Sequence, residues 1–358
     1  MATNQQNQAA WLMSKQEHPF KVDKAPFPEP TGRSIVIRNH AVAMNPVDAG
    51  IQKYGILWTT FPCILGSDVA GEIIALGPEV TRFRIGDRIT GCVEDGGFQL
   101  YPSVHESVAA RLPSHVSYAQ GSVLPLAVCT AAVSIFHPEN LALPPPQLEP
   151  KGNGRVVLAW GASSSVGACG VQMIKAAGFE VAATASKHNE AFCKEIGVDY
   201  FFDHRSENVV EQIINTLKDK DFAGVFSAIF LGGDVLPKCT EIASRLGKDP
   251  ASRVVATVLP DSMPYTEPVQ DGVRIAYCNS TVEIMPAKKL AKQFGWEKKP
   301  NSIEQDVWVN WLPAALEKGL MKCKPDPEVV GQGLEKIQDA VDIIGAGVSA
   351  KKIVVELP

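Results

Sequence analysis

The sequence has no clustered cysteines and no pair with C-x-x-C spacing. Its eight cysteines are scattered, and the nearest two are Cys169 and Cys193. Clustered cysteines and histidines are the usual ligands of structural zinc, so a site of that kind is excluded. Scattered cysteines are typical of a reducing compartment, in which most of them act as small buried hydrophobic residues.

The sequence also lacks a secretory signal and a membrane-spanning run. Residues 1–8 are polar and uncharged after Met1, without a basic or an apolar region. No apolar run approaches the ~20 residues that cross a bilayer. The formal net charge of −5 offers no electrostatic reason to bind nucleic acid or an anionic membrane. We therefore expect a cytoplasmic protein that binds neither.

The remaining composition is that of a globular protein. Apolar residues make up 45% of the chain and charged residues 20%, which are ordinary values for a soluble domain. A chain of 358 residues is too long for one ordinary core. The sequence therefore predicts two domains.

Residues 155–167 are the stretch around which the chain is organised. Residues 156–159 are apolar and partly β-branched, which predicts a buried strand of a parallel sheet. A turn from Gly161 to Gly167 follows, and a helical pattern then runs to Gly178. Strand, glycine turn and helix in this order begin a βαβ dinucleotide-binding unit, whose helix N-terminus can hold a pyrophosphate.

The turn departs from the usual G-x-G-x-x-G fingerprint, because its second glycine is replaced. Ser163, Ser164 and Ser165 stand between the two flanking glycines, and their hydroxyls can donate to phosphate oxygens. Alone, a serine-rich turn fits an ordinary strand-to-helix loop equally well. The strand-like run at residues 180–185 after the helix favours the nucleotide site.

The end of that second strand predicts the cofactor. NAD-binding units place an acidic residue there for the ribose 2′-hydroxyl. This chain has Ser186-Lys187-His188-Asn189, so no carboxylate repels a 2′-phosphate at this point and Lys187 can attract one. The alternative is a solvated basic turn. NADP binding explains both the missing acid and the added cation.

The rest of the pattern defines the fold class. Residues 33–43 alternate like a strand, residues 45–48 predict a turn, and residues 62–91 predict several strands separated by glycines. Residues 118–136 have a helical pattern, and the prolines of residues 137–154 predict an exposed connector. From residue 155 to 277 strands and helices alternate, which indicates a doubly wound parallel sheet. The clearest later strands are predicted at residues 224–229 and 253–258. A further helix is predicted at residues 302–318 and a last strand at 351–357.

An N-terminal β domain and four motifs carry a family resemblance. The motifs are Asn45-Pro46-Val47-Asp48, Gly66–Gly71, Gly86-Asp87-Arg88 and Gly161–Gly167. In this order they resemble the medium-chain dehydrogenase/reductase superfamily, in its zinc-free quinone reductase and enoyl reductase branch. The proline-rich connector and the Ser-Lys-His-Asn turn are most similar to fungal trans-acting enoyl reductases, which are partners of polyketide synthases.

The resemblance implies an α/β architecture of two domains. Residues 1–127, completed by residues 296–358, would form a GroES-like catalytic domain. Residues 128–295 would form a Rossmann domain with a doubly wound parallel sheet that binds NADPH. The active site would lie in the cleft between the domains.

The resemblance also implies that no metal is bound. In zinc-dependent relatives the first two ligand positions correspond to Asn45 and Ser67, and neither is a zinc ligand here. The four-cysteine lobe of those relatives is absent. Asp48 and Asp68 remain as carboxylates, more readily explained as caps of a turn and a strand than as ligands.

Cofactor contacts follow from the same resemblance. Asn45 and Thr130 would lie near the nicotinamide ribose. Ser186, Lys187 and His204 would hold the 2′-phosphate, with His204 replacing a tyrosine of related reductases; a plain surface role for His204 is equally compatible. The pyrophosphate would be held by the turn residues Gly161, Ser163, Ser164, Ser165, Val166 and Gly167.

One departure concerns catalysis. Polyketide-type enoyl reductases commonly carry a lysine where this chain has Gly50, and the nearest lysine is Lys53. This weakens the case for an enoyl-thioester substrate and leaves the proton donor undefined. The catalytic candidates are Asn45, Lys53 and Tyr54, although Tyr54 is equally suited to packing.

The activity expected is hydride transfer from NADPH to a C=C bond conjugated with a carbonyl, as in an enoyl reductase of fungal secondary metabolism. Asn45 would stabilise the developing enolate and solvent would supply the proton. An NADPH quinone oxidoreductase and a catalytically silent NADPH-binding protein are the alternatives. The partner would be a small-molecule substrate, free or as a polyketide on a carrier protein, and the enzyme would be a monomer or a homodimer.

Overall fold

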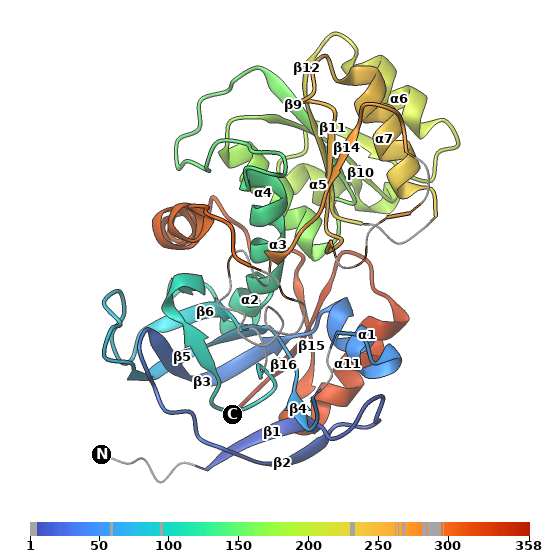
Figure 1. The fold of residues 1–358 in the computed structure, drawn as a ribbon. Coiled ribbons are helices and arrows are strands. Elements are labelled where there is room, and N and C mark those ends of the chain that lie inside the picture. Colours follow the sequence, from blue (N-terminus) through green and yellow to red (C-terminus); the bar gives the residue numbers. More distant parts are fainter. Residues whose placement is uncertain are drawn as a thin grey trace. The chain divides into compact units, whose positions relative to one another are not determined.

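The computed structural model describes residues 6–57, 60–93, 96–229, 233–261, 263, 265–266, 269–280, 284, 295 and 297–358. The chain divides into two compact units (Figure 1). The first consists of Met1–Leu126, Met285–Gln293 and Asp326–Pro358, and the second of Ala127–Ile284 and Phe294–Pro325. The first unit is therefore assembled from segments that are far apart in the sequence.

The first unit contains two sheets. The larger has the strand order β15-β16-β3-β5-β6-β8, with β7 also paired to β3, and the smaller has the order β2-β1-β4. All paired strands are antiparallel except β15 and β16. The strands are β1 (Asn7–Leu12), β2 (Lys21–Ala25), β3 (Ser34–Ala43), β4 (Cys63–Ile64), β5 (Asp68–Leu76), β6 (Arg88–Cys92), β7 (Ser103–His105), β8 (Ala109–Arg111), β15 (Pro327–Gln332) and β16 (Lys352–Glu356).

Short helices connect these strands. They are α1 (Pro46–Tyr54), η1 (Glu106–Val108), α2 (Tyr118–Ser122), η4 (Leu334–Lys336) and α11 (Ile337–Ala346). The turn predicted at residues 45–48 is instead the start of α1. Pro46 is tolerated at the first helical position because its missing N–H has no partner there, and Gly55 ends the helix with φ of 62°.

The second unit contains a parallel sheet with the strand order β11-β10-β9-β12-β13-β14. Counted from β9, this is the 3-2-1-4-5-6 order of a dinucleotide-binding sheet. Its strands are β9 (Arg155–Trp160), β10 (Glu180–Ala185), β11 (Tyr200–Asp203), β12 (Asp221–Ser227), β13 (Val254–Thr257) and β14 (Arg274–Ala276). The strand order reverses beside β9, so the carboxyl ends of β9 and β12 border the crevice in which such sheets bind nucleotides.

Helices accompany the strands of this sheet. They are α3 (Pro125–Phe136), α4 (Ser165–Ala176), η2 (Lys187–Asn189), α5 (Glu190–Glu195), α6 (Val209–Leu217), α7 (Val235–Leu246), the π-helix η3 (Glu304–Trp311) and α10 (Leu312–Glu317). Apolar side chains of β9, β10, β12, α6 and α7 form one buried cluster. The predicted strands at residues 156–159 and 180–185 are confirmed as β9 and β10. The strand predicted to start at Gly224 begins earlier, at Asp221.

The second boundary between the units differs from the sequence expectation. Residues 296–325 were expected to complete the first domain, but residues 294–325 belong to the second unit. Gln172 of α4 explains the attachment, because its side chain accepts from the Lys322 N–H at 2.7 Å and donates to the Lys322 carbonyl at 3.2 Å. A side chain in α4 therefore holds this segment in place.

The connector at residues 137–154 is less exposed than predicted. Leu141 and Leu143 are buried, and so is His137. The prolines prevent regular structure without removing the apolar side chains from the core. The segment is a packed loop rather than a free linker.

One stretch is long and apolar enough to cross a membrane, contrary to the sequence expectation. Tyr118–Phe136 spans 19 residues with a mean hydropathy of 1.6, but 78% of its window is buried inside the structure. It forms the two core helices α2 and α3. None of the eight cysteines forms a disulfide, and all but Cys63 and Cys323 are buried.

Candidate functional site

The turn between β9 and α4 has the close packing that a nucleotide site needs. Gly161 has φ of 86°, and a Cβ there would lie 2.4 Å from Ile229 Cγ1. A Cβ on Gly167 would lie 2.1 Å from the Gly161 carbonyl oxygen. Side chains are therefore excluded at both glycines. Without these side chains, the backbone of the turn can pack closely against the start of α4.

The serines of this turn have different roles. Ser164 caps α4: its hydroxyl donates to the Gly161 carbonyl at 2.9 Å and accepts the Gly167 N–H at 3.0 Å. The Ser164 hydroxyl thus donates its proton within the protein. The expectation that all three hydroxyls donate to a phosphate is therefore restricted to Ser163 and Ser165. The N–H groups of Ser165 and Val166 lie in the first turn of α4 and have no intrahelical partner.

These features fit a pyrophosphate. The cap leaves backbone N–H groups at the N-terminus of a twelve-residue helix, where anions are favoured. Ser163 and Ser165 are partly exposed beside them and add hydroxyls. This part of the candidate site is made entirely from neighbours in the sequence.

The candidate 2′-phosphate residues are brought together at the ends of two parallel strands. Ala185 of β10 is paired with Asp203 of β11, and the His204 N–H donates to the Ala185 carbonyl at 3.2 Å. Ser186 and Lys187 follow β10 directly, so they stand beside His204. The side chain of Lys187 is 70% exposed and available to a ligand.

A carboxylate that the sequence analysis did not consider stands at this site. Glu190 Oε2 lies 2.6 Å from Lys187 Nζ, and Glu190 Oε1 lies 2.8 Å from Lys194 Nζ. Hydrogen bonds from Lys187 and then Lys194 lower the pKa of Glu190 to about 2. Lys187 therefore has an internal partner that a phosphate would have to displace.

Thr130 lies on α3 in the second unit. Its hydroxyl is 3.4 Å from Ser280 Oγ, just beyond β14, and its carbonyl accepts from the Cys278 thiol at 3.5 Å. Thr130 is thus held near the segment that follows the last strand of the parallel sheet. Its contact with the nicotinamide ribose stays a prediction.

The three catalytic candidates are not brought together. Asn45 precedes α1, whereas Lys53 and Tyr54 lie in its last turn. Nine helical residues extend about 13 Å at 1.5 Å each, so the two groups are at opposite ends of the helix. Tyr54 is 62% exposed, and Lys53 Nζ lies 5.3 Å from its ring centroid. Local sequence distance was a poor guide here because the segment is a helix and not a turn.

Asn45 has a different environment. It is buried, its Nδ2 donates to Asp68 Oδ2 at 2.9 Å, and its Oδ1 accepts from Lys352 Nζ at 2.5 Å. Lys352 Nζ is also 2.8 Å from Asp68 Oδ2. Sequence reasoning missed Lys352, because nothing in the sequence distinguishes it from the adjacent Lys351.

Asp48 completes this group as the cap of α1. Its Oδ2 accepts the Asn45 N–H at 2.8 Å. Burial, with a contribution from Asp68, raises the pKa of Asp48 to about 7, although hydrogen bonds from the Asn45 and Gly66 N–H groups and the charge of Lys352 oppose the rise. Asp48 is therefore a carboxyl that titrates near neutral pH inside the fold.

The raised pKa predicts how stability depends on pH. Folded Asp48 binds its proton more tightly than the unfolded chain, whose reference pKa is 3.8, so its stabilising contribution is complete below that pH and is lost as the pH rises to about 7. At ~1.4 kcal/mol per pKa unit the loss is at most about 4 kcal/mol. Urea unfolding of the wild type and Asp48→Asn should show the variant gaining relative stability between pH 4.5 and 8. Parallel pH curves for the two proteins would contradict the assignment.

The zinc donor set of related enzymes is not present at this place. Lys352 already brings a positive charge to Asp68 and Asn45, and an ammonium is not a metal ligand. Across the described residues, no group of three or more histidine, cysteine, aspartate or glutamate side chains is placed to hold a metal ion. The residues around Asn45 therefore do not fit a zinc ion.

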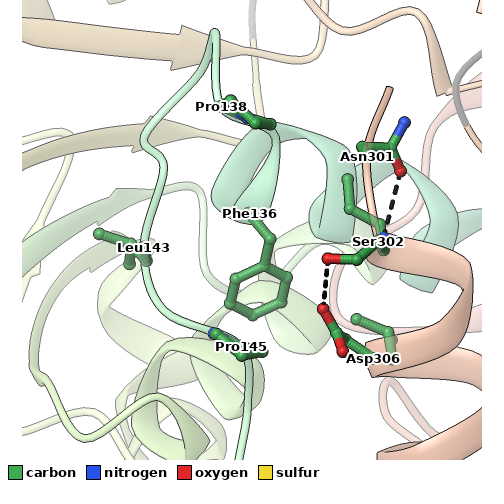
Figure 2. Close-up of a pocket in the computed structure, with 9 residues that line it drawn as sticks. Phe136, Pro138, Leu143, Pro145, Asn301, Ser302 and Asp306 are labelled. Carbon is green, nitrogen blue, oxygen red and sulfur yellow. Dashed lines mark hydrogen bonds between the residues drawn. The ribbon is translucent and has the colours of Figure 1, made fainter. Parts of the chain in front are cut away.

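A separate small cavity lies in the second unit. Its volume is about 140 Å³, and it is lined by α3, the proline-rich loop and the start of η3. Figure 2 shows Phe136 pointing into it, toward Ser302 and Asp306. Ser302 Oγ donates to Asp306 Oδ2 at 2.5 Å and the Ile303 N–H donates to Asn301 Oδ1 at 3.1 Å. The lining contains none of the predicted site residues.

Comparison with family models and known proteins agrees with this architecture. Residues 31–114 match the alcohol dehydrogenase GroES-like domain, and residues 165–248 match the zinc-binding dehydrogenase family. Solved structures share the fold: an alcohol dehydrogenase superfamily protein from Novosphingobium aromaticivorans has a TM-score of 0.76 at 22% identity and covers 98% of this chain and 100% of its own. The CurK enoyl reductase has a TM-score of 0.73 at 20% identity, with 99% and 100% covered.

Two fungal proteins are similar over nearly their whole length. Dehydrogenase pigH of Monascus ruber is 35% identical, with 98% of this chain and 99% of that protein covered. Trans-enoyl reductase himH of Aspergillus japonicus is also 35% identical, with 98% and 97% covered. The GroES-like and Rossmann architecture predicted from the sequence is thereby confirmed. The chain belongs to the medium-chain dehydrogenase/reductase superfamily and is an oxidoreductase of its enoyl reductase type.

Proposed function

We propose that this enzyme uses NADPH to reduce a C=C bond conjugated with a carbonyl group. The observation that carries the proposal is the whole-length similarity to a protein named trans-enoyl reductase. Two further fungal relatives with that name are 30% and 31% identical. The Rossmann strand order and the glycine turn before α4 support a nicotinamide cofactor.

The bound nicotinamide would supply the hydride, and the protein's own groups would hold the cofactor and polarise the substrate. The first-turn N–H groups of α4 bind the pyrophosphate. Asn45 Nδ2 carries two hydrogens, of which one donates to Asp68. The second has no partner among the described residues of the first unit, so it can donate to the substrate carbonyl oxygen as negative charge develops there. Solvent supplies the proton.

Steady-state oxidation of NADPH against a panel of acceptors tests this function. Simple enones, enoyl thioesters and quinones should be compared at equal concentrations with the purified chain. Turnover of enones or enoyl thioesters is expected, and a preference for carrier-protein-bound thioesters over free ones would identify a synthase as the partner. Turnover of quinones alone, or tight NADPH binding without turnover, would contradict the proposal.

Cofactor preference should depend on Lys187. A charge-assisted hydrogen bond to phosphate is worth about 1.5–3 kcal/mol, so Lys187→Ala should weaken NADPH binding about tenfold or more. NADH binding should barely change, because NADH lacks the 2′-phosphate. Fluorescence titration of both cofactors gives the two affinities.

Lys194 offers a matched control, because it pairs with the same glutamate as Lys187. Lys194→Ala should leave both cofactor affinities unchanged. Glu190→Gln should tighten NADPH binding, because Lys187 would no longer be held by a carboxylate. Equal losses of NADPH and NADH affinity in Lys187→Ala would contradict the assignment of the 2′-phosphate site.

We also propose that the reaction needs no zinc, because Asn45 and Ser67 stand at the first two ligand positions of zinc-dependent relatives and neither is a zinc ligand. Elemental analysis of the purified protein should find no stoichiometric zinc, and incubation with a chelator should leave turnover intact. One tightly held zinc per chain would overturn this proposal.

A further inference from the structure

Topology places Lys352 beside Asn45. In the larger sheet of the first unit, β3 lies between β16 and β5 and is antiparallel to both. The starts of β16 and β5 therefore flank the end of β3. Lys352 and Asp68 are the first residues of those two strands, and Asn45 follows the end of β3. The sheet thus brings a cation and a carboxylate to the two sides of one amide.

The contacts fix the orientation of that amide. An ammonium has only donors, so the Asn45 group that faces Lys352 Nζ must be the carbonyl oxygen Oδ1. The NH₂ group is then turned toward Asp68, to which it donates one hydrogen. A flipped amide would set NH₂ against the ammonium and a carbonyl oxygen against the carboxylate. The contacts therefore allow only one orientation of the amide, in which the NH₂ group faces Asp68.

Burial makes this arrangement rigid. Lys352 is 1% exposed, Asp68 0% and Asn45 5%. Asp68 is held further because its Oδ1 accepts the Leu126 N–H at 2.6 Å. Water has little access to replace any of these bonds, and both charged groups have a partner of opposite sign within the cluster. The amide is therefore held on both of its polar atoms.

We propose that Lys352 is a positioning residue for the reduction: it holds the Asn45 carbonyl oxygen so that the free N–H of Asn45 is presented to the substrate. This inference rests on the proposed function. Lys352 itself does not touch the reacting atoms. It acts only through Asn45.

The test combines two readouts. The variant Lys352→Met/Asp68→Asn replaces the ion pair with neutral groups, so that no buried charge is left alone. Its NADPH affinity should stay within twofold of the wild type, while kcat should fall about tenfold. In nitrogen-proton correlation spectra, the side-chain NH₂ signals of Asn45, identified by their loss in Asn45→Ala, should shift and lose protection from solvent exchange.

Lys351→Met is the matched control. Lys351 is adjacent in sequence but is exposed and pairs with Glu328. This variant should keep the wild-type kcat and Asn45 signals. Adding Asn45→Ala to the double variant should lower kcat no further than Asn45→Ala does alone, because both act through one amide.

Three results would overturn the proposal. They are unchanged Asn45 signals in the double variant, an unchanged kcat in that variant, and losses that multiply when Asn45→Ala is added. A wild-type protein that oxidises no NADPH with any acceptor would instead defeat the proposed function. In that case the Asn45 signals alone would test the positioning role of Lys352. Unchanged signals in the double variant would still refute that role.

Discussion

Replacing Lys352 with methionine alone should lower the free energy of unfolding by about 3–5 kcal/mol. Methionine is similar in length to lysine and packs well in an apolar core, so little packing is lost. The loss comes from Asp68, which is fully buried and would lose its partner of opposite sign, the ammonium 2.8 Å away. The hydrogen bonds from Asn45 and the Leu126 N–H do not neutralise it.

Urea unfolding of the full chain measures this effect. The double variant Lys352→Met/Asp68→Asn should recover most of the lost free energy, because the unpaired charge is removed with its partner. Lys351→Met should stay within about 0.5 kcal/mol of the wild type, since an exposed ion pair contributes little. A double variant as unstable as Lys352→Met would show that the lysine side chain stabilises the fold by packing and not by charge.

Asn45→Ala should lower kcat by roughly 10²-fold with little change in NADPH affinity. In the proposed reaction the amide donates to developing negative charge in the transition state, and removal of one such donor typically has this effect. Stability should fall by only about 1–2 kcal/mol, because Lys352 and Asp68 still contact each other when the amide is gone. The hydrogen bond from the Asn45 N–H to Asp48 Oδ2 also remains.

Gln52→Ala is the matched control for Asn45→Ala. Gln52 is a buried amide in α1 whose Nε2 donates to the Glu17 carbonyl and to Gln338. Its loss should lower stability by a similar amount and leave kcat near the wild-type value. Melting temperature, NADPH affinity and kcat should be measured on the same preparation. An unchanged kcat in Asn45→Ala would remove Asn45 from the site.

Sequence patterns predicted the parts of the fold that depend on neighbours along the chain. The apolar runs of β9 and β10 are equal in length and equally buried, and the turn from Gly161 to Gly167 lies between them. The start of β12 was misplaced, because Gly224 resembles a strand boundary although it lies inside the strand at φ of 124°. Its Cβ would meet Leu141 at 2.8 Å, a contact that no local pattern contains.

The candidate site also has one part that could be predicted from the sequence and one part that could not. Ser186 and Lys187 follow one strand directly, so their position could be predicted from the motif alone. Lys352 could not, because it is separated from Asn45 by 307 positions and acts through sheet pairing. The helix α1 was also missed, since Pro46 and Gly50 reduce the helical pattern that Asp48 stabilises as a cap.

The position of β16 has a consequence for the order of synthesis. Its partner β3 is made early, but the 226 residues from Leu126 to Lys352 must be translated before β16 can pair with residues Ala41–Ala43. At ~5–20 residues per second this takes about 11–45 s, during which the parallel sheet of the second unit can close. Throughout that interval one edge of β3 offers unpaired backbone groups to other strands. The nascent first unit is therefore open to edge-to-edge pairing with other chains until β16 is made.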